Sequence, residues 1–153
     1  MADAPDCSIQ RTLDLVGDRW TLLILRDIFR GVRRFSQIQV DLGIARNLLT
    51  DRLTALVDAD VLERIPYQER PLRHEYRLSV KGRDLSGALI ALMQWGDRWT
   101  TDLPPTVLVH DRCGTPLEQF PVCPSCREEV PPGHIRGRPG PGRSSQELIH
   151  API

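Results

Sequence analysis

The stretch that decides the fold is residues 35–65, FSQIQVDLGIARNLLTDRLTALVDADVLERI. Its first part has the apolar spacing of a short helix that ends at Gly43. After the turn DLGIAR, a second helical pattern has its apolar stripe at Leu49, Leu53, Leu56 and Val57. Two short helices joined by a turn that contains glycine are typical of a helix-turn-helix.

Helical spacing also dominates the residues before this stretch. The first helix is marked by one apolar face, at Ile9, Leu13 and Val16. Asp18 is then a candidate N-cap for the next helix, RWTLLILRDIFRG (19–31). Because this segment is apolar on nearly all sides in its first turns, we expect a central, buried helix.

The period of the pattern changes after residue 60. VLERI (61–65) and HEYRLS (74–79) alternate between apolar and polar residues, as two strands do. The residues between them, PYQERPLR (66–73), contain two prolines and predict a connection too long for a tight turn. A last long helix should follow Ser79, its expected cap, with apolar residues at Leu85, Leu89, Leu92 and Trp99.

The element order is therefore four helices, a hairpin and a final helix. A hairpin directly after the second helix of a helix-turn-helix has the position of a wing. We therefore predict a mainly α fold with a small β-hairpin, a winged helix-turn-helix. Its recognition helix would bury one face in the domain and place the other in the major groove of DNA.

Side chains suited to DNA lie on this recognition helix, before the helix-turn-helix and at the expected wing tip. Arginine and asparagine read base edges, and arginine and threonine also hold phosphates. The predicted DNA-binding residues are Arg33, Arg34, Arg46, Asn47, Thr50, Arg52, Arg70 and Arg73. Two observations weigh against this prediction. A polar helix face is more often simply solvated, and the aspartates at 51, 58 and 60 would have to point away from phosphate. Arg52 could be structural instead.

The composition is that of an ordinary globular protein, with 41% hydrophobic and 26% charged residues. Twenty basic and twenty acidic residues cancel, which is mild evidence against nucleic-acid binding. No stretch approaches the roughly 18–20 apolar residues that cross a bilayer, and the N-terminus lacks a signal-peptide pattern. We expect a cytoplasmic protein without membrane contact. No nucleophile–base pairing or phosphate-cradling glycine loop points to an enzyme.

Six motifs follow one another through residues 7–99. They are Cys7, GDRWTLLILR (17–26), RFSQI (34–38), LTDRLTAL (49–56), EYRLSVKG (75–82) and WG (95–96). Together they resemble the HxlR-type branch of the MarR-like winged-helix transcription regulators. This resemblance implies a DNA-binding homodimer that is held by its first and last helices and acts on a pseudo-palindromic operator.

The last helix gives an independent reason to expect a dimer. Its leucines, with Trp95 and Trp99, form more apolar surface than a domain of about 90 residues readily buries alone. A two-fold dimer would place its recognition helices about 34 Å apart, one turn of B-DNA, so we expect an inverted-repeat operator. Residues 7–102 are the predicted DNA-binding and dimerisation domain.

Cys7 lies just before the first predicted helix. Several HxlR-type regulators sense electrophiles or oxidants with an N-terminal cysteine, and the resemblance places Cys7 at that position. A helix N-terminus favours the reactive thiolate, and two copies of Cys7 could form an intersubunit disulfide. The alternative is an inert residue packed at the dimer interface. A small-molecule effector between the dimer helices and the DNA-binding core is a further hypothesis, although no residue identifies the ligand.

Residues 110–126, HDRCGTPLEQFPVCPSC, contain the other three cysteines and one histidine in H-x2-C and C-x2-C pairs. Three sulfurs and one imidazole suit tetrahedral zinc, and two-residue gaps let each pair chelate one ion. We predict a structural zinc site in a zinc-ribbon-like segment, 103–129, with the ligands His110, Cys113, Cys123 and Cys126. Four protein ligands leave no open position for catalysis.

Other interpretations fit this cluster less well. A zinc deaminase needs Glu where this chain has Arg112, and Pro where it has Val122. A redox pair of the last two cysteines lacks a strand–helix context. His110 could be uninvolved, with water in its place, and His134 is a substitute ligand, whereas His150 fits poorly.

The remaining residues, 130–153, are rich in proline and glycine and predict a disordered tail. Three functions stay open. The first is a dimeric DNA-binding regulator with structural zinc. The second is a redox- or metal-responsive sensor whose signal is zinc release or cysteine oxidation, and the third is a protein-interaction module.

Overall fold

The computed structural model describes residues 7–138 and 140–141. They belong to two compact units, one of residues 7–89 and one that continues from Ile90. The boundary between the units falls inside the last long helix, whereas the predicted domain ran to residue 102.

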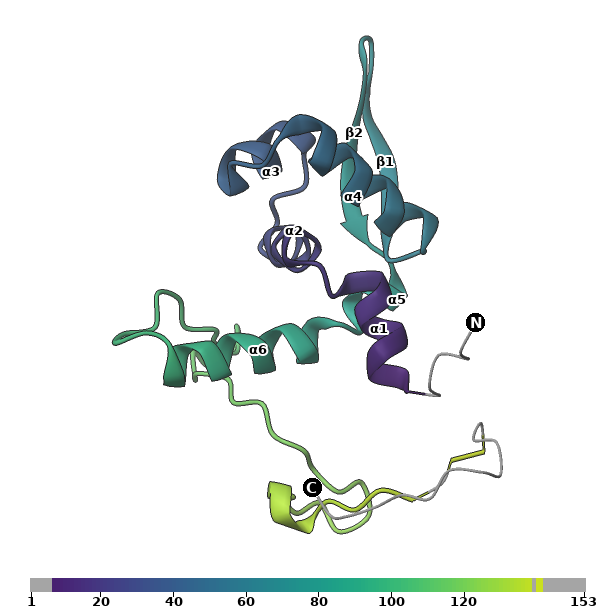
Figure 1. Ribbon diagram of the computed structural model, residues 1–153. Helices are drawn as coiled ribbons and strands as arrows, with labels where there is room; N and C mark the ends of the chain where they lie inside the picture. The colour runs from purple at the N-terminus through teal and green to yellow at the C-terminus, as the bar shows by residue number, and fades with distance from the viewer. Residues whose placement is uncertain (1–6, 139, 142–153) are drawn as a thin grey trace. The chain divides into compact units, whose positions relative to one another are not determined.

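The first unit has the predicted order of elements. The helices α1 (Ser8–Val16), α2 (Arg19–Phe29), α3 (Phe35–Leu42) and α4 (Arg46–Asp58) precede the strands β1 (Leu62–Glu69) and β2 (Leu72–Leu78). The strands form an antiparallel hairpin. Figure 1 shows it as a narrow ribbon whose tip points away from α1. The expected mainly α fold with a small hairpin is confirmed.

The hydrophobic core of this unit lies between α2, α3, α4 and the base of the hairpin. Its buried apolar side chains are Val16, Ile24, Leu25, Ile28, Ile38, Ile44, Leu49, Leu53, Leu56, Val61 and Leu62. The predicted stripe of α4 is confirmed, because its three leucines are buried and Val57 packs against them. Each fully buried aliphatic side chain of this size contributes about 1.5–3 kcal/mol to folding.

Gly43 forms the turn of the helix-turn-helix. It ends α3 in the left-handed conformation, with φ +59°, and its N–H donates to the carbonyl of Val40 at 3.3 Å. Glycine adopts this conformation without steric cost. Ile44 then enters the core, so α4 starts with its apolar stripe already facing inward.

The hairpin connection is shorter than the sequence predicted. β1 runs on to Glu69, which pairs with Leu72, so Arg70 and Pro71 alone form the turn. The strand tolerates its own proline because the register shifts between Pro66 and Gln68. A proline at such an irregularity, or in a turn, removes no regular ladder hydrogen bond. The two prolines therefore mark a bulge and a tight turn, and the expectation of a long loop was wrong.

The expected final helix is divided in two, α5 (Val80–Arg83) and α6 (Ser86–Trp99). Ser79 caps α5, because its Oγ accepts a hydrogen bond from the Gly82 N–H at 3.0 Å. The same hydroxyl donates to the Asp60 carbonyl at 2.6 Å, which fastens α5 to the end of α4. The predicted cap is thus correct, but the helix that it starts is one turn long.

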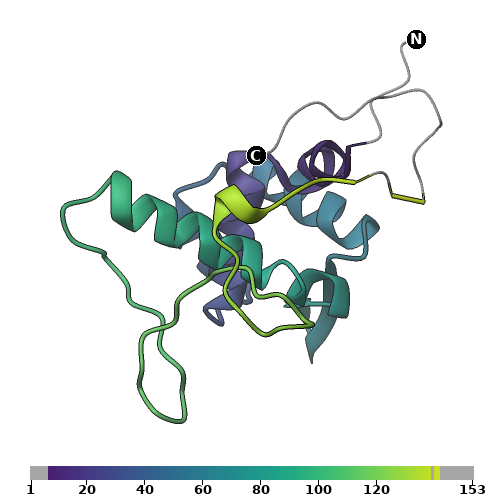
Figure 2. The ribbon, with the colours of Figure 1, turned by 90° about the horizontal axis from the view of Figure 1, so that it is seen from below.

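In the second unit, α6 is followed by turns and isolated bridges rather than by further long elements in the described residues. Figure 2 shows this part as a looped path with one short helical turn, η1 (Pro132–His134). Of the predicted tail, residue 139 and residues 142–153 lie outside the described residues.

Gly82 and Gly96 offer a matched pair of substitutions. A Cβ at Gly82 would lie 2.2 Å from the backbone oxygen of Val61, so Gly82→Ala must displace α5 and should lower the free energy of unfolding by about 2–4 kcal/mol. At Gly96, in α6, the nearest atom would be Thr100 Oγ1 at 3.7 Å, so alanine should stabilise by up to about 1 kcal/mol. Urea denaturation of both variants measures this. Equal effects would contradict the tight contact at Gly82.

Candidate nucleic-acid interface

The first turns of α4 present a polar face to solvent. Arg46, Asn47, Thr50 and Asp51 are all exposed there. The Thr50 hydroxyl donates to the Arg46 carbonyl at 2.9 Å, so its oxygen keeps free lone pairs for an outside donor. The Arg46 guanidinium lies 5.5 Å from the ring centroid of Phe35, a cation–π contact with the start of α3. Three of the predicted DNA-binding residues therefore share one exposed face.

The segment before α3 attaches the hairpin to the helix-turn-helix. The Tyr76 N–H of β2 donates to the Arg33 carbonyl at 2.8 Å, and Arg34 forms an isolated bridge with Glu75. The Arg34 guanidinium also lies 4.3 Å from the ring centroid of Tyr67 in β1. No sequence pattern indicated this stacking, because it joins residues on separate elements.

The hairpin tip carries the other two predicted arginines. Arg70 and Arg73 are both exposed, and Gln68 Nε2 donates to the Arg70 carbonyl at 3.0 Å. Further down the hairpin, Arg64 Nη2 lies 3.1 Å from His74 Nδ1. Figure 1 shows the end of this hairpin projecting beyond the helices of the unit.

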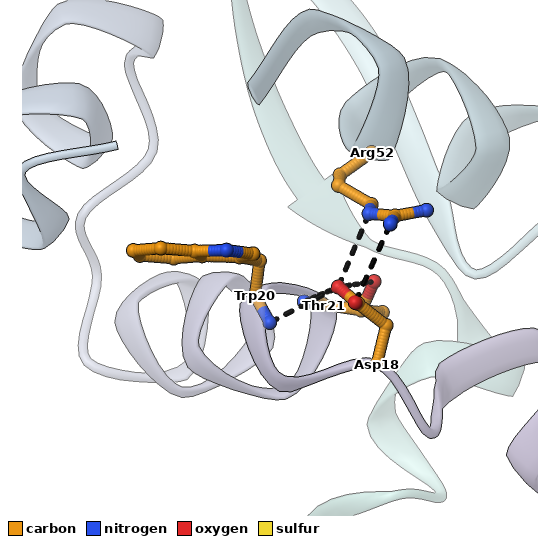
Figure 3. A network of polar contacts seen from close by, with 4 residues as sticks. All are labelled: Asp18, Trp20, Thr21 and Arg52. Atoms are coloured by element: carbon orange, nitrogen blue, oxygen red, sulfur yellow. Dashed lines mark hydrogen bonds and ion pairs between the residues drawn. The ribbon is translucent and has the colours of Figure 1, made fainter. Parts of the chain in front are cut away.

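Arg52 is used inside the protein. Its Nη2 donates to Asp18 Oδ2 at 3.3 Å, and its Nε forms an ion pair with Asp18 Oδ1 at 3.1 Å that is too poorly aligned for a hydrogen bond (Figure 3). Asp18 Oδ1 also accepts from the backbone N–H groups of Trp20 (3.0 Å) and Thr21 (3.2 Å). The predicted N-cap of α2 is confirmed, and Arg52 connects that cap to α4.

The acidic residues near α4 are unevenly placed. Asp58 and Asp60 lie at the C-terminal end of the helix, away from the turn that carries Arg46 and Asn47. Asp51 is exposed one turn after Asn47 and stays on the polar face. The first turns of α4 are therefore the part most suited to DNA.

The predicted redox and metal residues are separate from this face in sequence. Cys7 is the N-cap residue of α1, is exposed, and makes no side-chain capping hydrogen bond. In the second unit, His110 Nδ1 lies 3.1 Å from Cys113 Sγ. Cys113 Sγ donates to Thr115 Oγ1 at 3.3 Å, and the side-chain and backbone hydrogen bonds with Thr115 lower the pKa of the Cys113 thiol.

The second pair of predicted metal ligands is also locally organised. The backbone N–H groups of Cys126 and Ser125 hydrogen bond to the Cys123 sulfur and lower the pKa of that thiol. Among the described residues no three His, Cys, Asp or Glu side chains lie close enough together to hold one metal ion. The four predicted ligands thus meet as two pairs. His134 lies in η1, and His150 lies outside the described residues.

Gln94 in α6 contacts the loop between the two pairs. Its Nε2 donates to the Leu117 carbonyl at 2.6 Å, and its Oε1 accepts from the Gln119 N–H at 2.9 Å. No sequence pattern pointed to this residue, since a lone glutamine on an apolar helix has many ordinary uses. The two hydrogen bonds fix this loop on α6.

Residues 15–103 match the HxlR-like helix-turn-helix family. The chain belongs to this family. It is 47% identical over 137 residues to Rv3095, an HTH-type transcriptional regulator of Mycobacterium tuberculosis, a match that covers 88% of this chain and 87% of that protein. The protein is therefore an HxlR-family transcriptional regulator with DNA as its implied partner, and not an enzyme.

Two solved structures are similar to different shares of this HxlR-family protein. PA1607, a candidate transcription factor, is 35% identical with a TM-score of 0.79, and the match covers 88% of this chain and 95% of that one. The redox regulator HypR in its oxidised form is 26% identical with a TM-score of 0.57, over 62% of this chain and 99% of that one. Within residues 7–138 and 140–141, every helix is too short or too polar to span a lipid bilayer.

A double-mutant cycle tests the link between α2 and α4 in this HxlR-family protein. Asp18→Ala removes the cap and should lower the free energy of unfolding by about 1–2 kcal/mol. Arg52→Ala should cost less, and the coupling between the two should be about 0.5–1 kcal/mol, because both side chains are partly exposed. Urea denaturation measures all three values. Asp51→Ala with Arg52→Ala is the control cycle, and a coupling no larger than in that control would rule out the ion pair as a contributor.

Proposed function

We propose that this protein binds a pseudo-palindromic, inverted-repeat DNA operator as a homodimer and so regulates transcription in the cytoplasm. The observation that carries the proposal is the exposed face of α4, with Arg46, Asn47 and Thr50 opposite a fully buried stripe. Residues in the first turns of a recognition helix contact base edges in the major groove. Arginine suits guanine and asparagine suits adenine, so this face has the chemistry for direct readout.

Four other predicted arginines lie on neighbouring segments of the same unit and suit phosphate contacts. Arg33 and Arg34 precede α3, and Arg70 and Arg73 lie at the wing tip. Contacts to phosphate set the register of a protein on DNA without reading sequence. We assign Arg52 a positioning role, since its guanidinium is held by Asp18 and orients α4 rather than reaching outward.

Two helices support the dimer. On α6 the apolar residues Leu92, Trp95 and Trp99 are 55%, 62% and 68% exposed, and their spacing places them on one helix face. On α1, Ile9 and Leu13 are also more than half exposed. A second copy of the chain that covers these faces would remove apolar surface from water and set two recognition helices about 34 Å apart.

Gel-shift titration tests the DNA proposal with an inverted-repeat duplex selected from a random library. Arg46→Ala and Asn47→Ala should each weaken binding to the selected duplex by about 1–3 kcal/mol, because each removes a base contact. Arg73→Ala should instead weaken all duplexes alike and lower the slope of log affinity against log salt by about 1, because it removes a phosphate contact.

The controls for this titration come from the same chain. Arg83→Gln removes an arginine on α5, outside the proposed interface, and should leave the affinity nearly unchanged. Trp95→Glu with Trp99→Glu should shift the free protein to the mass of a monomer and abolish the two-chain complex. Salt-independent binding, or selection of a single half-site by one chain, would contradict the proposal.

A redox-responsive form of the same regulator is the second candidate function. Cys7 supports it, since the thiol is exposed at the start of α1, next to the apolar residues assigned to the dimer. The similarity to the redox regulator HypR is in line with this. The step would join Cys7 to Cys7 of a second copy, while an oxidant such as diamide takes up the two electrons and two protons.

Treatment with diamide should therefore yield a covalent dimer that a reductant reverses. Mass spectrometry and non-reducing electrophoresis detect the cross-link, and operator affinity before and after treatment shows whether it is a signal. Cys7→Ser should abolish the cross-link, whereas Cys113→Ser, a matched exposed thiol, should retain it. An unmodified Cys7, or a cross-link that survives in Cys7→Ser, would eliminate this function.

A further inference from the structure

The Cys/His segment folds as two copies of one hairpin, residues 108–117 and residues 121–130. Each copy contains one isolated antiparallel bridge, Val109–Pro116 in the first and Val122–Glu129 in the second. The outer residues pair as well, since Leu117 N donates to the Leu108 carbonyl at 2.8 Å. The counterpart in the second copy, from Val130 N to the Pro121 carbonyl, is 2.9 Å long.

The inner hydrogen bonds of the two hairpins also match position by position. His110 N donates to the carbonyl five residues on at 2.9 Å, and Cys123 N does the same at 3.0 Å. Their carbonyls accept from Gly114 N (2.7 Å) and Arg127 N (2.9 Å). Both of these residues are left-handed, with φ of +71° and +62°. Glycine adopts the left-handed conformation freely, whereas for Arg127 it costs about 1 kcal/mol. The two hairpins therefore form the same turn although their turn residues differ.

Both hairpins carry a Cys or His at the same two positions. In the first, His110 Nδ1 and Cys113 Sγ are 3.1 Å apart. Tetrahedral zinc with bonds of about 2.0 and 2.3 Å holds such atoms about 3.6 Å apart, so the pair is close to its chelating separation. In the second, the Cys123 thiol has hydrogen-bonding contacts with the backbone of Ser125 and with both the backbone and the side chain of Cys126.

Neither hairpin has a hydrophobic core of its own. Val109, Leu117 and Val122 are all more than 40% exposed, and no residue of either hairpin belongs to the buried core of the described chain. All four cysteines are free thiols. Segments this short are stably folded only when a metal or a covalent link joins them. A shared ion is the link that these side chains can supply.

We propose that His110, Cys113, Cys123 and Cys126 bind one zinc ion that joins the two hairpins. Three thiolates and one imidazole match the ligand preference of zinc, and four protein ligands make the site structural. Because the side chains now meet as two pairs, binding draws the hairpins together across the linking residues 118–120, and the three thiol protons pass to solvent.

Gln94 seats this module on α6. Its amide donates to the carbonyl of Leu117, the last residue of the first hairpin, and accepts from the N–H of Gln119 in the link, so the start of the link would keep its place when the hairpins close. The module also lies within the region shared with relatives. A match that covers 88% of this chain, as those to Rv3095 and PA1607 do, necessarily includes residues 108–130. The inference does not depend on DNA binding.

Cobalt titration of the full-length chain, without a histidine tag and stripped of metal under reductant, tests the site. One equivalent of Co²⁺ should produce tetrahedral ligand-field bands and thiolate charge-transfer absorption, and Zn²⁺ should abolish both. Cys123→Ser and Cys126→Ser should lower cobalt affinity at least tenfold. Cys7→Ser is the matched control and should bind like the natural chain. No tetrahedral spectrum, or an equal loss in Cys7→Ser, would overturn the proposal.

Further variants test the fourth ligand and the role of Gln94. His110→Ala should change the cobalt spectrum while His134→Ala leaves it unchanged, and the reverse result would refute the ligand set. Gln94→Ala should keep the spectrum but weaken cobalt binding by about tenfold, as loss of a supporting contact does. Unchanged affinity would refute its role. Far-UV circular dichroism checks that each variant keeps its helices.

Discussion

The arrangement of the DNA-binding unit depends on the carboxylate of Asp18. One oxygen accepts the first free backbone N–H groups of α2, and the whole group faces the guanidinium of Arg52 on α4 (Figure 3). Helix N-termini leave such donors unsatisfied, so this carboxylate is favoured there by hydrogen bonds and by the helix dipole. The buried leucines of α4 hold this helix on the core, and the ion pair adds a contact between α4 and the capped start of α2.

The wing is held by different forces. Backbone pairing connects Arg33 and Arg34 to β2, and the Arg34 guanidinium stacks on Tyr67 of β1. A two-stranded hairpin by itself is only marginally stable in water, so these contacts stabilise the hairpin and hold it against the helix-turn-helix. An arginine that stacks with one face still has N–H donors at its edge. Arg34 can therefore hold the wing and contact phosphate at once.

The sequence predicted what depends on local periodicity. The stripe of α4, the turn at Gly43 and the caps at Asp18 and Ser79 all follow from neighbours within one or two turns. The prediction failed for the hairpin connection, because prolines occur in loops as well as at strand irregularities and in tight turns. Here Pro66 precedes the register shift in β1, and Pro71 lies in the two-residue turn. The sequence also could not pair Arg52 with Asp18, or Gln94 with its loop, because such contacts depend on how separate elements pack. For the same reason, the sequence could not distinguish the arginines that are exposed from Arg52, which pairs with another side chain of the protein.

The helix α6 carries both the residue that holds the Cys/His segment and the apolar face proposed for dimerisation. Gln94, which holds the loop between the Cys/His hairpins, lies on α6 between Leu92 and Trp95, two residues of the exposed apolar stripe. Successive helical residues are about 100° apart, so the loop is bound on the flank of the face assigned to the partner subunit. A zinc ion that holds the hairpins closed would therefore also hold this loop in one place beside that face. Without the ion, the loop would keep its two hydrogen bonds to Gln94, each of which contributes about 1 kcal/mol. If the proposed zinc ion and the proposed dimer both form, release of the ion or oxidation of its thiolates would act on the loop beside the dimer face, and through that face on the spacing of the two recognition helices.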